Sequence, residues 1–509
     1  MKRLRITAIA TAFLSLSLAQ VSQALPTTRP VRVTGGRIMG SEDGALNEYF
    51  AIPFAAPPVG ELRWRAPQPV VPWKGIKTTR DYSPACSQTA AWISHPKSED
   101  CLYLNIWAPQ NAKHLPVIVW IHGGAMESGT AAVPVQNGAN LAKRGAVVVT
   151  LNYRLGIFGF YASPELSAES PEHVSGNQGI LDQIAALRWI RSNIAVFGGD
   201  PDRVTIMGNS SGGESVALLV ASPLAKGLFQ RAIAESGNDA MPISPDDNHR
   251  FDQKAAAEAK GQTFAKAVGA DHLTDLRKMS VEDLQKQNWL PRVYIDGHLL
   301  HSDLTTIYRN HTQNDVPLLV GWTAEEGKDL VGFYLDPSES TTARHIDQIT
   351  KLLGYPPSDS LLAAYPGATD SEATASITRL TNDWWGWRMV HWAALQAKYG
   401  RAKSFVYYFA HRPAAPRTPC NWGCGAGHGV EVQYMLDNLD VDARSWSPDD
   451  KQLATRLADT VIQFARTGSP TGKGLSAWPI FDGLNESILL IGNETQLKAH
   501  PLPDFSVFP

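Results

Sequence analysis

The chain has 509 residues, with 46 lysines and arginines against 49 aspartates and glutamates, a formal net charge of -3 at pH 7. No long basic run appears, and this near-neutral balance excludes nucleic acid as an expected partner. The length suffices for a large hydrophobic core, and large α/β enzymes of this size often form one unit.

The first 24 residues have the pattern of a secretory signal peptide. Basic residues up to Arg5 precede an apolar run over 6–19, which is too short for a comfortable membrane span. We expect cleavage after Ala24, where small residues form a cleavage signal, and an uncleaved N-terminal anchor is the alternative. The sequence therefore predicts a secreted or periplasmic protein with no stable membrane insertion and with one domain over residues 25–509.

Continuous β-branched runs predict strands that are buried on both faces. In chain order these strands are expected at 115–124, 145–154, 203–208, 316–323 and 404–411. Between the second and third run, apolar side chains from Ile180 to Ile194 recur at helical spacing. This order predicts a mostly parallel central sheet with helices on both faces. The charged stretches 249–289 and 340–400 are expected to be helices packed over the sheet or a helical cap.

A serine-containing turn follows the third predicted strand, in the sequence VTIMGNSSGGESV. Only the frame Gly208–Gly212 fits the pattern G-x-S-x-G, which places Ser210 at the tip of a tight strand-to-helix turn. Ser211 would then supply a backbone N–H group. A Gly/Ser-rich turn without a catalytic role is the alternative, so the interpretation depends on partners elsewhere in the chain.

A serine nucleophile needs a base, an acid that orients the base, and N–H donors for the oxyanion. The glycine-rich segment 120–129, WIHGGAMESG, follows a predicted strand and leaves backbone N–H groups uncovered. Glu325 and Glu326 follow the strand at 316–323, and His428 lies in a glycine-rich loop. Serine, acid and histidine thus occur in the order of sheet hydrolases. The residues alone leave either glutamate open, and solvated loops are the alternative at each position.

The four cysteines form two sequence-local pairs, Cys86 with Cys101 and Cys420 with Cys424. Export favours disulfides, and of the three possible connectivities proximity favours these two pairs. Cys420, Cys424 and His428 are also spaced four apart, which would suit a metal ion on a helix. The segment is rich in glycine and proline, so a helix is not expected there and the disulfide is favoured.

Tryptophans cluster in the stretch TNDWWGWRMVHW, at Trp384, Trp385, Trp387 and Trp392. Packing of a helix against the core is the favoured interpretation. A binding surface for an apolar or aromatic substrate is the alternative.

Several long motifs resemble the type-B carboxylesterase family, the cholinesterase-like branch of the α/β-hydrolases. They include SEDCLYLNIWAP at 98–109, LNYRLGIFGF at 151–160 and AIAESG at 232–237, and the resemblance covers nearly the whole chain after residue 30. It implies an α/β-hydrolase fold with a helical cap over the active site. It also implies a serine carboxylic ester hydrolase that acts on small-molecule esters.

By this resemblance, Ser210 is the nucleophile, His428 is the general base and Glu326, rather than Glu325, is the acid. The family's oxyanion-hole donors correspond to Gly124, Ala125 and Ser211. No metal or organic cofactor is expected for this chemistry.

The resemblance assigns a disulfide to Cys86 and Cys101, whereas the pair Cys420 and Cys424 lies outside the common family pattern. Asn209 replaces the usual glutamate before the nucleophile, so the pH dependence is expected to differ. The alternatives are a non-catalytic binding protein of the same fold, or the same machinery acting on amides, thioesters or polymer esters. The natural substrate and the oligomeric state are not predicted.

Overall fold

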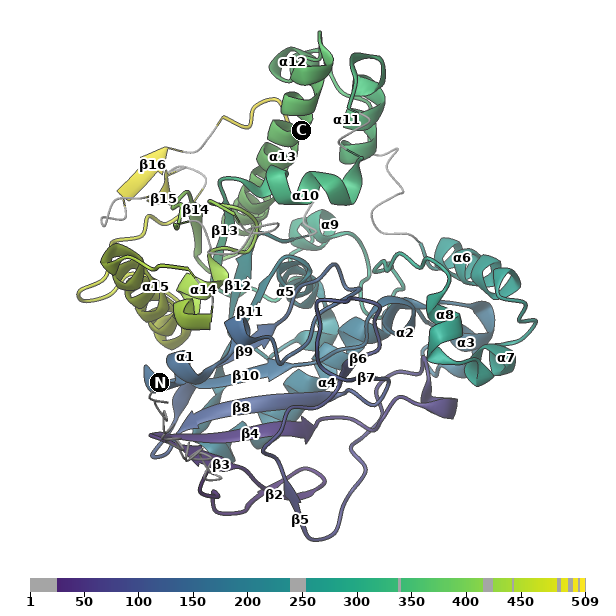
Figure 1. The fold of residues 1–509 in the computed structure, drawn as a ribbon, viewed down its shortest axis with the longest axis vertical. Coiled ribbons are helices and arrows are strands. Elements are labelled where there is room, and N and C mark those ends of the chain that lie inside the picture. The colour runs from purple at the N-terminus through teal and green to yellow at the C-terminus, as the bar shows by residue number, and fades with distance from the viewer. Residues whose placement is uncertain are drawn as a thin grey trace, which may run out of the picture.

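The computed structural model describes residues 25–238, 253–336, 340–414, 424–441, 444–482, 487–492, 498–501 and 504–508. Within these residues the centre is an 11-stranded sheet of strand order β16-β15-β14-β13-β12-β11-β9-β10-β8-β4-β3 (Figure 1). Neighbouring strands from β15 to β10 in this order are parallel, and the strands outside them pair in antiparallel fashion. The predicted mostly parallel sheet is confirmed.

The strands of this sheet are β3 (Ser41–Asp43), β4 (Leu46–Pro53), β8 (Tyr103–Pro109), β9 (Leu115–Ile121), β10 (Val147–Leu151), β11 (Gly199–Asn209), β12 (Arg231–Glu235), β13 (Leu318–Thr323), β14 (Ser404–Phe409), β15 (Ser487–Ile491) and β16 (Lys498–Pro501). Smaller sheets contain β1 (Val31–Val33), β2 (Gly36–Met39), β5 (Ile76–Thr78), β6 (Ala85–Cys86) and β7 (Lys97–Ser98). All the strands predicted from β-branched runs are present. β12 was not predicted because it is short, has charged residues at both ends and carries Ile233 as its one β-branched residue.

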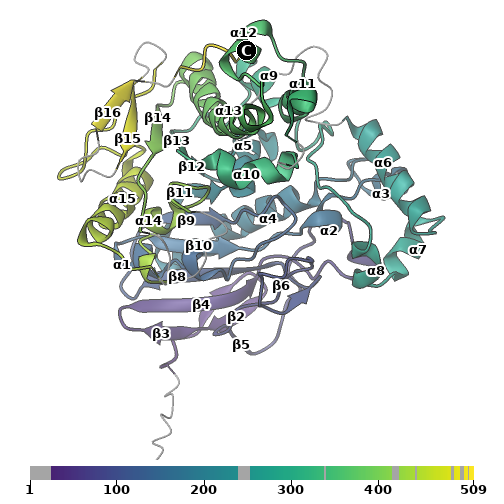
Figure 2. The ribbon, with the colours of Figure 1, turned by 45° about the horizontal axis from the view of Figure 1, so that its top comes forward.

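The helices are α1 (Ala139–Lys143), α2 (Gly156–Phe160), α3 (Pro164–Glu169), α4 (Gln178–Asn193), α5 (Ser211–Ala221), α6 (Lys254–Ala267), α7 (Leu273–Lys278), α8 (Val281–Gln285), α9 (Leu304–Arg309), α10 (Glu326–Tyr334), α11 (His345–Leu353), α12 (Asp359–Ala364), α13 (Asp370–Tyr399), α14 (Val432–Met435) and α15 (Pro448–Thr467). In both ribbon views α6, α7 and α8 gather beside α3, whereas α10 to α13 form a separate group (Figures 1 and 2). The described parts of the two charged stretches, 253–289 and 340–400, are therefore largely helical, as predicted.

Strand β9 shows why helices must cover both faces of the sheet. Val117 and Val119 point into one hydrophobic core, which includes side chains of α4, α5 and α13. Ile118 and Trp120 alternate with them and point into a second core, which includes side chains of α15. Each fully buried aliphatic side chain contributes roughly 1.5–3 kcal/mol, so neither face tolerates exposure to water.

Helix α4 is joined to the segment that follows β10 by a buried ion pair between Arg154 and Asp182. The guanidinium donates to both carboxylate oxygens, at 2.8 Å and 2.7 Å, and the Arg154 N–H donates to the same carboxylate at 3.1 Å. The remaining arm of Arg154 donates to the Arg65 carbonyl at 2.8 Å. Bidentate geometry and these extra hydrogen bonds offset part of the cost of removing both charges from water, but burial still leaves the pKa of Asp182 above its usual value.

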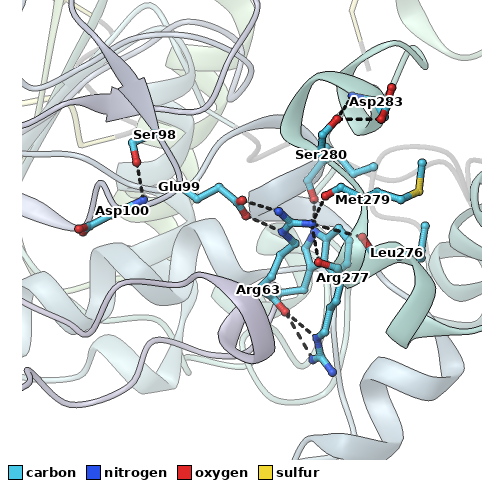
Figure 3. Close-up of polar contacts among 11 residues, drawn as sticks. Arg63, Ser98, Glu99, Asp100, Leu276, Arg277, Met279, Ser280 and Asp283 are labelled. Carbon is cyan, nitrogen blue, oxygen red and sulfur yellow. Dashed lines mark hydrogen bonds and ion pairs between the residues drawn. The ribbon is translucent and has the colours of Figure 1, made fainter.

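A second ion pair connects the N-terminal part of the chain to α7. Arg63 pairs with Glu99, and the same guanidinium donates to the backbone carbonyls of Leu276, Arg277 and Met279 at the end of α7 (Figure 3). A cation at the carboxyl end of a helix satisfies carbonyl groups that have no partner within the helix. The SEDCLYLNIWAP motif, which contains Glu99, therefore stabilises the group of helices beside α3.

The predicted disulfide between Cys86 and Cys101 is confirmed, with an S–S distance of 2.05 Å. Cys424 is also disulfide-bonded, and its predicted partner Cys420 lies outside the described residues. No helix in the described part of the chain is both long and apolar enough to cross a bilayer.

Replacement of Asp182 by alanine should destabilise the protein strongly, because it leaves the buried Arg154 charge unpaired. The expected loss is about 3–5 kcal/mol of unfolding free energy, measured by thermal and urea denaturation. Arg191→Ala on the same helix is the matched control, since Arg191 pairs with Asp202 at the surface. Equal losses in the two variants would contradict this account of α4.

Candidate active site

Ser210 lies at the turn between β11 and α5, where its backbone adopts φ 57° and ψ -129°. Such angles are unfavourable for residues other than glycine, so the surrounding structure must hold the turn. The Ser210 N–H donates to the Glu235 carbonyl at 2.9 Å, and the Glu214 N–H donates to the Ser210 carbonyl at 3.0 Å. The serine is therefore fixed at the carboxyl ends of parallel strands, where open α/β sheets bind ligands.

Glycines are required around this turn because neighbouring backbones pass very close to it. A Cβ atom at Gly212 would clash with the Ile121 carbonyl oxygen, and one at Gly237 would clash with the Ser210 carbonyl oxygen. Gly212 is the final glycine of the predicted G-x-S-x-G pattern. That part of the sequence signal thus has a direct steric cause.

The loop after β9 packs against the same turn. Gly124, Ala125 and Met126 have positive φ angles of 112°, 57° and 59°. The Met126 N–H donates to Ser211 Oγ at 3.1 Å, which ties this loop to the first residue of α5. In the part of the chain that the structure describes, no acceptor is hydrogen-bonded to the backbone N–H of Gly124, Ala125 or Ser211, which lie on the loop after β9 and at the start of α5.

Glu326 and His428 are in direct contact although 102 positions separate them in the sequence. Glu326 is the first residue of α10 and is fully buried, and its Oε2 lies 2.5 Å from His428 Nδ1. The other carboxylate oxygen accepts the Thr323 N–H at 2.8 Å and the Ser236 hydroxyl. The ring of His428 thus bonds a carboxylate that two other groups hold in place, the Thr323 N–H and the Ser236 hydroxyl.

For Glu326 and His428 alike, contacts with polar and charged neighbours together change the pKa more than burial does. Burial alone raises the pKa of Glu326, but the imidazole of His428 and the hydroxyl of Ser236 lower that pKa below its usual value. Burial lowers the pKa of His428, but the Glu326 carboxylate raises it above its usual value. An ionised carboxylate therefore supports an imidazole that gains a proton readily, which suits a general base.

Glu325, the other predicted candidate for the acid, has different partners. Its carboxylate accepts the Ala426 N–H at 2.9 Å and pairs with Arg412 at 2.9 Å and with Lys328. Burial raises the pKa of Glu325, but Lys328 and the Ala426 N–H lower it below its usual value. Among the described residues no hydrogen bond joins Glu325 to His428, so of the two glutamates Glu326 is the one bonded to the imidazole.

The loop that carries His428 lies against the turn that carries Ser210. A Cβ atom at Gly429 would lie 3.3 Å from Asn209 Oδ1, so the residues next to His428 and Ser210 are almost in contact. No hydrogen bond joins Ser210 Oγ to the imidazole within the described structure. Such bonds in ligand-free enzymes often tighten only when substrate binds.

All four tryptophans of the predicted cluster lie on α13 and are buried, as expected for packing of a helix against the core. Trp385 also contacts His428 edge-on, with the ring centroids 5.6 Å apart. Arg388, from the next turn of α13, stacks over Trp385 at 4.8 Å. Helix α13 therefore covers one side of the imidazole.

A buried carboxyl group behind the pair was missed by sequence reasoning. Glu431 is fully buried, and its Oε1 lies 3.3 Å from Asn209 Nδ2 and 3.2 Å from Ser236 Oγ. Burial and the nearby Glu326 charge raise the pKa of Glu431 to about 8, so this side chain is a neutral acid near pH 7. The signal that could have found it is a charged residue between two valines, three positions after His428.

The metal alternative for Cys420, Cys424 and His428 has no support. Cys424 is disulfide-bonded, and His428 Nδ1 faces Glu326 rather than a cysteine. In the described ranges, no group of three or more His, Cys, Asp or Glu side chains could hold a metal ion.

The sequence matches the carboxylesterase family over residues 27–504. It is 33% identical over 512 residues to the fumonisin B1 esterase of Sphingopyxis macrogoltabida, covering 96% of this chain and 91% of that protein. It is 34% identical over 495 residues to the para-nitrobenzyl esterase of Bacillus subtilis (strain 168), covering 92% of this chain and 95% of that protein. A solved structure of PNB esterase is similar at a TM-score of 0.79 and 32% identity, over 92% of this chain and 97% of that chain.

Replacement of Glu431 by glutamine should change how stability depends on pH. The pKa of Glu431 is raised in the folded protein, so between about pH 4.5 and 8 the unfolded chain loses this proton and the folded protein keeps it. The wild type should therefore lose stability relative to Glu431→Gln as the pH rises from 5 to 8. Melting temperatures across this range measure the difference, with the exposed Glu282→Gln as control. A difference that does not change with pH would contradict a neutral Glu431.

Proposed function

The chain belongs to the carboxylesterase family, and from this premise we propose that it hydrolyses carboxylic esters through an acyl-enzyme intermediate on Ser210. His428 acts as the general base, and Glu326 orients the imidazole and stabilises its protonated form. The observation that carries the proposal is the 2.5 Å contact between Glu326 and His428. Without such a base, a serine hydroxyl is a weak nucleophile.

Acylation begins when Ser210 Oγ bonds to the carbonyl carbon of the ester and its proton passes to His428. The carbonyl oxygen becomes an oxyanion, which accepts hydrogen bonds from the backbone N–H groups of Gly124, Ala125 and Ser211. The bond to the alcohol oxygen then breaks, and the alcohol leaves with the proton from His428.

Deacylation uses the same groups with water as the nucleophile. Water attacks the acyl carbon and gives a proton to His428, and the bond to Ser210 Oγ breaks as this proton returns to the serine. The carboxylic acid is released and the resting enzyme is restored. Removal of one oxyanion donor typically costs about 3–4 kcal/mol of transition-state stabilisation, so preorganised backbone donors carry a large share of the rate.

Export belongs to the same proposal. Residues 1–24 act as a cleavable signal peptide, and the mature chain is secreted or periplasmic. The disulfide between Cys86 and Cys101 supports this, because disulfides persist in oxidising compartments and are rare in the cytosol.

Replacement of Ser210 by alanine should lower kcat for p-nitrophenyl esters by at least about 10⁴-fold, because no other group can take the acyl chain. Ser211→Ala is the matched control. It keeps the backbone N–H and loses only the hydroxyl that accepts from Met126, so its kcat should fall about tenfold at most. Initial rates from acetate to decanoate esters measure both effects, and turnover that survives in Ser210→Ala would refute the assignment of the nucleophile.

The two neighbouring glutamates should differ sharply on conversion to glutamine. Glu326→Gln should lower kcat by about 10⁴-fold, because a neutral amide can neither hold the required imidazole tautomer nor stabilise its positive charge. Glu325→Gln keeps an oxygen that can accept from Ala426 N–H, so its kcat should stay within about tenfold of the wild type. Single-turnover rates with p-nitrophenyl acetate make the comparison. Similar losses in both variants would count against Glu326 as the acid.

A further inference from the structure

The loop that carries His428 has almost no side chains of its own to hold it. Residues 424–429 read CGAGHG, and Gly425 and Gly429 have positive φ angles of 64° and 78°. Glycine loses the most conformational freedom when it is ordered, so such a loop needs contacts from outside itself. A general base must nevertheless stay within a fraction of an ångström of its working position.

Helix α10 supplies the contacts that order this loop. The Glu325 N–H donates to the Ala426 carbonyl at 2.9 Å, and the Glu325 carboxylate accepts the Ala426 N–H at 2.9 Å. The Asp329 carboxylate accepts the His428 N–H at 2.8 Å. A Cβ atom at Gly427 would clash with the same Asp329 oxygen, so the backbone of the loop lies directly on this carboxylate.

Asp329 stands three residues after Glu326 on α10, on the same face of the helix. One turn of α10 therefore contacts both the side chain and the backbone of His428. Glu326 bonds the imidazole of His428, and Asp329 bonds its backbone N–H. A ring held only at Nδ1 could still move with its backbone, and the second contact removes that freedom.

We propose that Asp329 is a positioning residue for esterase catalysis, which fixes the backbone of His428 and adds its charge to the electrostatic field around the imidazole. The inference rests on the proposed role of His428 as the general base. Asp329 acts only through His428 and touches no reacting atom in this scheme.

Among the described residues, three elements bring charged groups close to His428. Helix α10 contributes Glu326 and Asp329, the turn after the loop contributes Glu431, and α13 contributes Arg388, which stacks over the ring of Trp385. Burial lowers the pKa of His428, whereas Glu326, Glu431 and Asp329 raise it in this order, and the net result lies above the usual value. The pKa of Glu431 is itself raised to about 8, so its contribution is present only when Glu431 is ionised. Near pH 7, where Glu431 is protonated, Glu326 and Asp329 are the carboxylates that act on the imidazole.

Three variants of the mature chain separate the effect of the Asp329 charge from the effect of its hydrogen bond to the His428 backbone. Asp329→Asn keeps an oxygen that can accept the His428 N–H but removes the charge. Its maximal kcat should stay within about threefold of the wild type, and the acid limb of kcat/KM should move to lower pH because the imidazole then loses its proton at lower pH. Asp329→Ala should show the same displacement and a kcat lower by about 10- to 100-fold, because the loop is no longer held.

Glu325→Gln is the matched control, because Glu325 holds the same loop while Lys328 and Arg412 neutralise its charge. The acid limb of its kcat/KM profile should lie at the same pH as in the wild type. An unmoved acid limb in Asp329→Asn, or the same displacement in Glu325→Gln, would overturn the inference. Circular dichroism and titration with a serine-reactive phosphonate verify that each variant is folded.

His428→Ala and Ser210→Ala, measured alongside, distinguish a failure of the proposed esterase function from a failure of the role proposed for Asp329. If both are inactive and Asp329→Asn matches the wild type at every pH, only the role of Asp329 is wrong. If His428→Ala retains the wild-type rate, the proposed function itself fails and the inference falls with it.

Discussion

The 2.5 Å contact between Glu326 and His428 is the interaction on which the account depends. It forms in a buried environment that opposes both charges, so it exists only because the fold supplies further hydrogen bonds to the carboxylate. Glu326 follows the carboxyl end of β13, and His428 lies in the loop that follows the carboxyl end of the neighbouring strand β14. The parallel sheet is thus the reason that two residues far apart in sequence meet.

Neighbouring strands and helices, rather than the residues proposed to react, hold the strained backbone and the flexible loop of the site. The unfavourable backbone of Ser210 is held by β12 and by the start of α5, and the glycine-rich loop of His428 is held by α10. Rigid strands and helices therefore position the three groups, while the short connections between them remain free to present polar atoms. This is the arrangement of the α/β-hydrolase fold, to which the solved relative belongs.

Local patterns predicted the strands, the helical stretches and the serine turn, because each depends on neighbours in sequence such as Gly208 and Gly212. Which carboxylate meets His428 could not be derived from spacing, and only the family resemblance favoured Glu326 over Glu325. Asp329 and Glu431 were missed because their environment is created by distant segments. A charged residue on a helix or after a loop is normally a solvated one. Only the tertiary structure shows that Asp329 bonds the backbone of His428 and that Glu431 bonds Asn209 and Ser236.

The most direct test of the central claim is to locate the group that becomes acylated. The purified mature protein is treated with a p-nitrophenyl phosphonate, which mimics the acyl step and stays attached, and the tryptic peptide 204–226 is fragmented by mass spectrometry. The account predicts one phosphonyl group per chain, on Ser210, with complete loss of esterase activity. An adduct on Ser211 or outside this peptide, or full activity in the labelled protein, would contradict it.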